Sequence, residues 1–127
     1  MKKLKKSAVV LCAVFASMQI TMAGQFDGVD VGLGKDFGGS QINHATDGLV
    51  GITGNGTGNV GLDFNSNTHI NWDNLNVGRG ESLNFNAVDG ANNLTILNTV
   101  NKGMTNVYGS INANSGIGQL IIANPNG

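Results

Sequence analysis

Two histidines and two aspartates are the first candidates for a metal site. His44 and His69 stand 25 residues apart, and no cysteine or carboxylate accompanies them at a ligand spacing. Asp27 and Asp30 form the string Asp-Gly-Val-Asp, which has too few oxygen ligands for a calcium loop. We therefore expect no metal and no other cofactor, and we interpret the histidines as solvated or corner residues.

Two glycine-containing segments match catalytic or phosphate-binding loops only in part. Segment 80–84 is Gly-Glu-Ser-Leu-Asn, which lacks the second glycine of a serine-hydrolase nucleophile elbow. Segment 32–36 is Gly-Leu-Gly-Lys-Asp, which lacks the upstream glycine and the Ser or Thr of a phosphate loop. The carboxylates are scattered along the chain, so no acid–base pair can be argued. We expect no catalytic residues and no enzymatic activity.

The elements that position these residues must be short and rich in turns. The 127 residues include 20 Gly and 19 Asn but only one Pro. Gly and Asn accept positive φ and disfavour long helices. The 40% of hydrophobic residues and the 12% of charged residues together argue against simple disorder. The length fits one domain or a part of one.

Residues 1–23 have the pattern of a signal peptide. Four lysines within the first six residues precede a mostly apolar run, and Thr21-Met22-Ala23 offers small residues at a cleavage site. An N-terminal membrane anchor is the alternative, but the run is short for a transmembrane helix. Cys12, the only cysteine, lies in this run behind Leu11, where a lipoprotein signal needs a small residue. We expect export through the periplasm, and a secreted or cell-surface protein without disulfides.

Removal of the leader changes the charge balance. Three cations and eight carboxylates follow residue 23, so the formal net charge becomes −5, against −1 for the full chain. No basic patch remains in residues 24–127. The electrostatic footprint of nucleic-acid binding is therefore missing, and we expect no nucleic-acid partner.

Residues 24–127 alternate between short apolar runs and turn residues, which predicts an all-β fold. The first part, 24–40, is glycine-rich and weakly patterned, and we expect an irregular capping segment there. No window of 11 or more residues shows a period of 3.6. The last apolar run, Leu120–Ala123, is continuous, as in a strand buried on both faces. The predicted strands are Leu49–Ile52, Val60–Phe64, Ile70–Trp72, Leu75–Val77, Ser82–Phe85, Leu94–Leu97, Val107–Ile111 and Gln119–Ala123.

Two architectures accommodate many short strands: a sandwich or barrel, and a solenoid. The abundance of Asn and Gly favours the solenoid, a right-handed parallel β-helix, because each coil needs sharp corners. Asn side chains can also form hydrogen-bonded ladders between coils. The chain has no exact repeat, so periodicity alone does not decide between the two.

Three segments resemble, in the same order, motifs of filamentous-haemagglutinin-type exoproteins. Ile70–Phe85 is similar to their INW..FNIG..E.V.F stretch, and Val107–Asn114 is similar to their I.G.L.ANG segment. Gln119–Gly127 resembles the signature that ends in Asn-Pro-Asn-Gly. Residues 24–127 therefore resemble the N-terminal part of the two-partner secretion domain, also called the haemagglutination-activity domain.

The resemblance implies a right-handed parallel β-helix with an N-terminal cap in a large Gram-negative exoprotein. Such a domain is a secretion and targeting module, and an outer-membrane β-barrel transporter with POTRA domains recognises it. The chain lacks a separate Asn-Pro-Asn-Leu motif, so it resembles the branch of the family without one. Relatives continue beyond the Asn-Pro-Asn-Gly signature. We therefore expect a truncated solenoid whose absent downstream region engages a host or neighbouring cell surface. The residues implied in partner recognition are Asn124, Pro125, Asn126, Gly127, Asn71 and Trp72.

The structural roles of these residues can also be predicted from their chemistry alone, without the family resemblance. Pro125 cannot donate a ladder hydrogen bond and should end the strand before it, after which Asn126-Gly127 should form a turn. Trp72, the only Trp, should pack in the first coils. Asn71 and Asn76 should satisfy backbone groups at corners.

The alternative function is that of an exported polysaccharide-active β-helix enzyme. It requires Asp or Glu residues clustered on one sheet face. No stretch after Gly24 supplies such a cluster.

Overall fold

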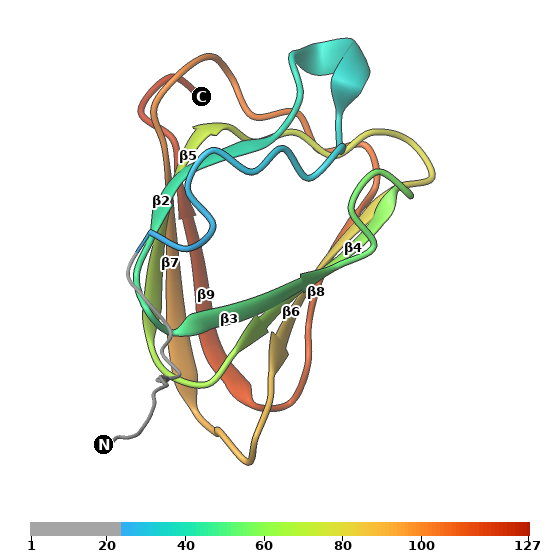
Figure 1. The fold of residues 1–127 in the computed structure, drawn as a ribbon. Coiled ribbons are helices and arrows are strands. Elements are labelled where there is room, and N and C mark those ends of the chain that lie inside the picture. The colour runs from blue at the N-terminus through green and yellow to red at the C-terminus, as the bar shows by residue number, and fades with distance from the viewer. Residues whose placement is uncertain (1–23) are drawn as a thin grey trace, which may run out of the picture.

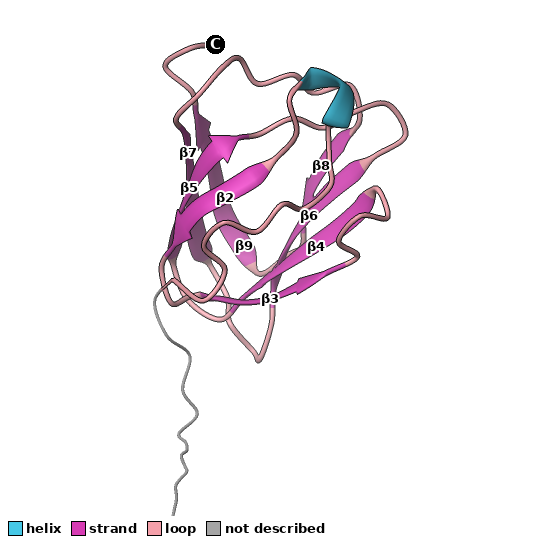
Figure 2. Cartoon of the chain, turned by 45° about the horizontal axis from the view of Figure 1, so that its top comes forward, coloured by secondary structure: helices cyan, strands magenta, loops and turns pink. Residues whose placement is uncertain are grey.

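The computed structural model describes residues 24–127 and is nearly all-β (Figures 1 and 2). Its strands form two mixed four-stranded sheets, and one 3-10 turn, η1 (Lys35–Phe37), lies outside them. The all-β prediction is therefore confirmed. The predicted signal peptide, residues 1–23, lies outside the described residues.

Each sheet has one antiparallel strand at its edge and three parallel strands. The antiparallel pairs are β2–β5 and β3–β4, and the other neighbours pair in parallel. The first sheet has the order β2 (Gln41–Ala45), β5 (Thr68–Asn74), β7 (Leu94–Val100), β9 (Ile117–Ala123). The second has the order β3 (Leu49–Thr53), β4 (Asn59–Phe64), β6 (Ser82–Ala87), β8 (Ser110–Ala113).

From β4 onward the chain visits the two sheets alternately. Val60 lies opposite Leu83, and Leu83 lies opposite Ile111, so the second sheet is revisited after 23 and then 28 residues. On a third side of the molecule, an isolated parallel bridge joins Val77 to Val107. In Figure 1 the two sheets converge at one end, and loops connect them across the other.

The core lies between the sheets and follows the period-two alternation of the strands. Strand β7 shows this alternation over its whole length, since every second residue from Leu94 to Val100 is buried. The rings of Phe64 and Phe85, from neighbouring strands, stack with centroids 5.8 Å apart. The largest fully buried side chains are Trp72, Phe64, Phe85, Leu33, Ile42, Leu49, Leu62, Ile70, Leu75, Leu83, Ile96 and Val31.

Residues 24–40 form an irregular segment, as predicted, with the η1 turn and an isolated bridge at Asp30. Val31 and Leu33 are fully buried in the core. The Val31 N–H donates to the Ser40 carbonyl, and the Val31 carbonyl accepts from the Gly56 N–H. In Figure 1 this segment (blue) crosses between the two sheets on the viewer's side. It therefore covers the core next to β2 and β3.

The strand predictions are confirmed with three differences. Of the predicted strand Val107–Ile111, only Ser110 and Ile111 lie in a strand, β8, and Val107 forms an isolated bridge. Strand β2 was not predicted, because Ile42 is its only large apolar residue and an alternation cannot be seen. The predicted strand Leu75–Val77 is wrong, because only Val77 forms a bridge there. Its residues are nevertheless fully or almost fully buried on the third side of the molecule.

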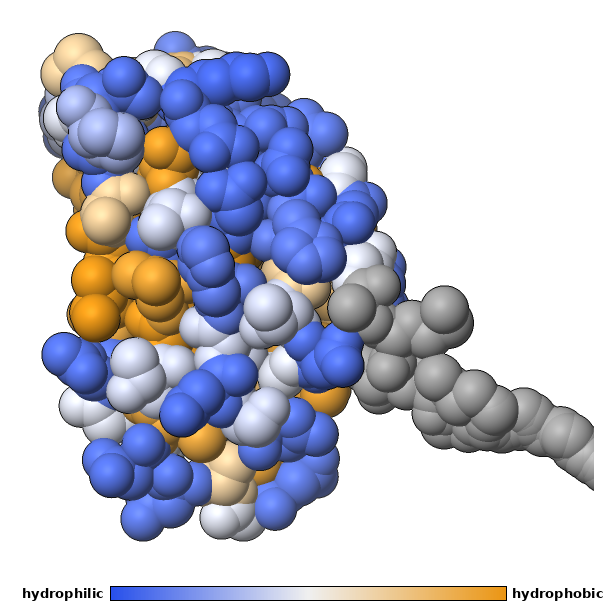
Figure 3. Space-filling view, turned by 90° about the vertical axis from the view of Figure 1, so that its left-hand side faces the viewer, coloured by the Kyte–Doolittle hydropathy of each residue, from blue (hydrophilic) through white to orange (hydrophobic). Residues whose placement is uncertain are grey.

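The prediction that Leu120–Ala123 is buried on both faces is wrong. Leu120, Ile121 and Ile122 are only partly buried, and Ala123 is exposed. The physical reason is that the core lies on one face of the sheet only, so Leu120 and Ile122 pack against it while Ile121 and Ala123 lie on the outer face. In addition, β9 is the last strand of its sheet, so no further strand covers its inner side chains from the open edge. Figure 3 shows this sheet from outside, and apolar side chains (orange) gather on the side away from the N-terminal trace.

Asparagine ladders connect neighbouring strands on the outer faces, as the composition predicted. The Asn84 side-chain amide donates to Asn59 Oδ1, and the Asn112 amide donates to Asn84 Oδ1, both at 3.0 Å. On the other sheet, Asn71 and Asn101 exchange two amide hydrogen bonds of 3.0 and 2.9 Å. These bonds fix the parallel register from outside the core.

Candidate functional site

The Asn-Pro-Asn-Gly string forms a tight turn directly after β9. The strand ends at Ala123, as expected from the missing N–H of Pro125. The Gly127 N–H donates to the Asn124 carbonyl at 3.1 Å, and the Asn126 N–H donates to Asn124 Oδ1 at 2.8 Å. The central residues are thus Pro125 and Asn126, one position earlier than predicted. Pro favours this position because its fixed φ suits the first central residue of a turn.

This turn is bound to the loop that follows β7. The Asn124 amide donates to the Gly103 carbonyl at 3.0 Å and to Thr105 Oγ1 at 2.8 Å. The Thr105 N–H donates back to the Gly127 carbonyl at 2.7 Å. Asn124 is half-buried, whereas Pro125, Asn126 and Gly127 are exposed. The string therefore presents a fixed, exposed corner whose first residue is its anchor.

Trp72 lies in the core, as predicted, and not on the surface. Its exposed fraction is zero, and its indole N–H donates to Asn98 Oδ1 at 2.8 Å. Asn98 is also fully buried, and its amide donates to the Ile121 carbonyl at 3.1 Å. The indole ring therefore has no surface for direct contact with a partner in the folded chain.

The two asparagines near Trp72 differ in role. Asn76 satisfies backbone groups at a corner, as predicted, because its amide donates to the carbonyls of Phe37 and Gly39. The prediction for Asn71 is wrong. Its amide bonds with the side chains of Thr99 and Asn101, since it belongs to a ladder on a sheet face.

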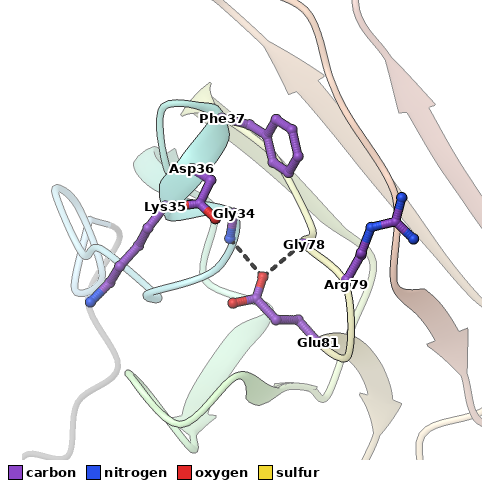
Figure 4. A pocket seen from close by; sticks show the side chains of 7 residues that line it. All are labelled: Gly34, Lys35, Asp36, Phe37, Gly78, Arg79 and Glu81. Carbon is purple, nitrogen blue, oxygen red and sulfur yellow. Dashed lines mark hydrogen bonds between the residues drawn. The ribbon is translucent and has the colours of Figure 1, made fainter.

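A pocket that sequence patterns did not predict lies between η1 and the loop after Val77. We call it the corner pocket, and its volume is about 240 Å³. Glu81 Oε1 accepts hydrogen bonds of 2.7 Å from the N–H groups of both Gly34 and Gly78, so one carboxylate oxygen joins the two loops (Figure 4). The lining residues are Gly34, Lys35, Asp36, Phe37, Gly78, Arg79 and Glu81.

Two exposed aromatic rings stand at this pocket. Phe37 lines it and stacks on Tyr108, with ring centroids 5.0 Å apart and an interplanar angle of 28°. The guanidinium carbon of Arg79 lies 5.6 Å from the centre of the Tyr108 ring, within the range of a cation–π contact. Phe37 and Tyr108 are 40% and 53% exposed. Exposed aromatic residues held in a cluster are typical of binding surfaces.

The pocket combines the two segments, 32–36 and 80–84, whose catalytic motifs are incomplete. Nothing local in either segment indicates a pocket, because Gly34 and Glu81 are 47 residues apart in the chain. The usable signal was the charged residues beside the glycines of both loops, together with the ring of Phe37 beside the glycines of the first loop. That signal does not say which loops meet.

The histidines have separate partners. His44 Nδ1 lies 3.0 Å from Asp27 Oδ1, and His69 Nε2 lies 2.8 Å from Thr99 Oγ1. Both histidines are exposed, which agrees with their interpretation as solvated residues. Within residues 24–127, no three His, Cys, Asp or Glu side chains form a group that could hold a metal ion. In the same range, no helix is long and apolar enough to span a membrane.

Comparison of the chain with family models, with curated proteins and with solved structures gives no match. The resemblance to the two-partner secretion domain thus remains a prediction from three motifs.

Proposed function

We propose that residues 24–127 are the N-terminal part of a secretion and targeting module of a Gram-negative surface exoprotein. An outer-membrane β-barrel transporter recognises the module through its periplasmic POTRA domains. The observation that carries the proposal is the Asn-Pro-Asn-Gly corner, which is exposed and bound in place by Asn124. The proposed module has no catalytic function of its own.

The proposed fold of this module is a right-handed parallel β-helix. Three features support it: parallel neighbours 23–30 residues apart in the chain, regular alternation between the two sheets, and a third parallel contact at Val77 and Val107. Each coil buries its apolar side chains against the next, as solenoid repeats do.

The strand edges provide a second means of recognition. β8 and β9 are the last strands of their sheets, so the outer backbone groups of both strands are unpaired within residues 24–127. An extended segment of a partner can add to such an edge by β-augmentation. The Asn-Pro-Asn-Gly corner directly follows β9 and would place the partner relative to that edge.

Replacing Asn124 and Asn126 with Ala is expected to block export of a reporter fused after Gly127 when the transporter is co-expressed. Asn124→Ala removes the anchor of the corner, and Asn126→Ala removes an exposed amide that a partner can bind. The measurement is the amount of reporter in the medium relative to the amount inside the cells.

Asn55→Ala is a matched control, because Asn55 is an exposed asparagine in a glycine-flanked turn far from this corner in the chain. We expect this variant to export normally. Asn126→Ala alone serves as a variant with little structural effect, since the Asn126 side chain donates one long hydrogen bond of 3.3 Å and no other within the described part of the chain. Normal export of the double variant would contradict recognition at the corner.

The polysaccharide-active enzyme is less well supported. Asp36 and Glu81 both line the corner pocket, but they lie in loops and not on one sheet face. One oxygen of Glu81 is already occupied by two backbone N–H groups. We therefore keep the non-catalytic proposal.

A further inference from the structure

The corner pocket carries charged side chains of both signs in equal number. Its lining includes the cations Lys35 and Arg79 and the carboxylates Asp36 and Glu81, so its formal charge is zero. Within residues 24–127, none of these four side chains forms an ion pair. A ligand with a single charge is attracted by two of these groups and repelled by the other two. A zwitterion finds a partner for each of its charges.

Two of these charged groups are held in place before any ligand binds. Glu81 Oε1 accepts 2.7 Å hydrogen bonds from the N–H groups of Gly34 and Gly78, and both glycines are buried. Glu81 Oε2 forms no hydrogen bond with other described residues, so it can accept one from a ligand. The guanidinium carbon of Arg79 lies 5.6 Å from the centre of the Tyr108 ring. Groups that are already positioned lose little entropy when they bind a ligand.

The two groups are spaced apart, and an apolar ring stands beside them. Figure 4 shows that the side chains of Glu81 and Arg79 point in different directions from the loop that carries both. Phe37 lines the same pocket, is 40% exposed and is stacked on Tyr108. Stacked rings have few rotatable bonds and offer a large apolar surface to a ligand. The matching ligand therefore has a cationic end, an anionic end and an apolar body.

We propose that the corner pocket binds an apolar dipeptide with free termini. Its ammonium group donates to Glu81 Oε2, its carboxylate pairs with Arg79, and an apolar side chain packs on Phe37. The volume of about 240 Å³ is below the roughly 300–1,000 Å³ of sites for drug-sized ligands, so it suits a dipeptide and not a longer peptide. A free amino acid fits less well, because both of its charges are attached to one carbon. This binding is independent of the proposed secretion function, which rests on the Asn-Pro-Asn-Gly corner.

The test is a titration of the ¹⁵N-labelled full chain, followed by amide chemical shifts. The main probe is alanyl-leucine, which we expect to shift the amides of Gly34, Gly78 and Arg79 saturably at millimolar concentration. Three further probes each lack one feature. N-acetyl-alanyl-leucine has no ammonium group, alanyl-leucine amide has no carboxylate, and free leucine has no spacing between its charges. We expect each of these to bind at least about threefold more weakly, which is the size of one exposed ion pair.

Arg79→Gln should weaken the binding of alanyl-leucine about threefold and leave that of alanyl-leucine amide unchanged, because the amide has no carboxylate. Arg79 is exposed, so this variant keeps the core intact. Lys102→Gln is the matched control, because it removes an exposed cation that does not line the pocket, and it should bind like the parent.

Three results would overturn the proposal. The first is that alanyl-leucine does not shift the amides around the pocket. The second is that free leucine or either single-charge peptide binds as tightly as alanyl-leucine. The third is that Arg79→Gln weakens alanyl-leucine and its amide equally, which would mean that Arg79 only supports the fold of the loop.

Discussion

Replacing Trp72 with Ala is expected to lower the free energy of unfolding by about 3–5 kcal/mol. The indole is fully buried at the centre of β5, and its loss leaves a large cavity between the sheets. It also leaves Asn98 Oδ1, buried in β7, without the one side-chain donor that it has among the described residues. Domains of this size have a total stability of only about 5–15 kcal/mol, so the variant should be close to unfolding. Urea denaturation of the full chain, followed by circular dichroism, measures the loss.

Asn71→Ala is the matched control for this experiment. Asn71 is the neighbour of Trp72 in the same strand, but it lies on the outer face with its amide in a ladder. We expect it to cost no more than about 1 kcal/mol. A loss of less than about 1 kcal/mol for Trp72→Ala would contradict the core position of the indole. Such a result would imply that the indole lies at the surface, where Trp72 could take part in partner recognition.

Replacing Gly34 with Ala should be the next most damaging single change, at roughly 2–5 kcal/mol. Gly34 has a φ of +63°, which costs any residue with a Cβ about 1–2 kcal/mol. The added Cβ would also lie 2.7 Å from the carbonyl carbon and oxygen of Asn76, a backbone that cannot move aside. Thermal melts of the full chain followed by circular dichroism give the measurement.

Gly80→Ala separates these two causes. Gly80 has a similar φ of +73°, but a Cβ there would meet no atom within 4 Å. It should therefore show only the backbone strain, about 1–2 kcal/mol. Equal losses for the two variants would mean that the segment around Gly34 is not packed on Asn76. The corner pocket would then lack a fixed wall at Gly34.

The strands could be predicted from the sequence because their signals are local. In β6, Leu83 and Phe85 alternate with polar residues, and turn residues stand at both ends of the run. Neither the alternation nor the turn residues depend on distant contacts. The period-two signal fails in β2, where Ile42 stands alone among polar residues. The continuous apolar run Leu120–Ala123 led to a wrong prediction of burial on both faces. Burial depends on whether a further strand covers β9, which the run itself does not encode.

The candidate sites differ in how far the sequence could predict them. The turn at Pro125 follows from the chemistry of proline and asparagine and was expected within one residue. The corner pocket forms where the N-terminal segment packs on the third side of the molecule, where Gly34 meets Glu81 and Phe37 meets Tyr108. Register between distant segments is set by packing of the whole core, so no local pattern indicates it.

Direct binding between the full chain and the POTRA region of its transporter is the most direct test of the proposed function. The transporter is expected to be encoded beside this chain, and its purified periplasmic region can be titrated by calorimetry. We expect saturable binding that Asn124→Ala with Asn126→Ala weakens at least about tenfold, a loss of about 1.4 kcal/mol. Asn55→Ala should bind like the parent chain. Absence of binding by the parent chain, or equal binding by the double variant, would contradict a secretion module recognised at its Asn-Pro-Asn-Gly corner.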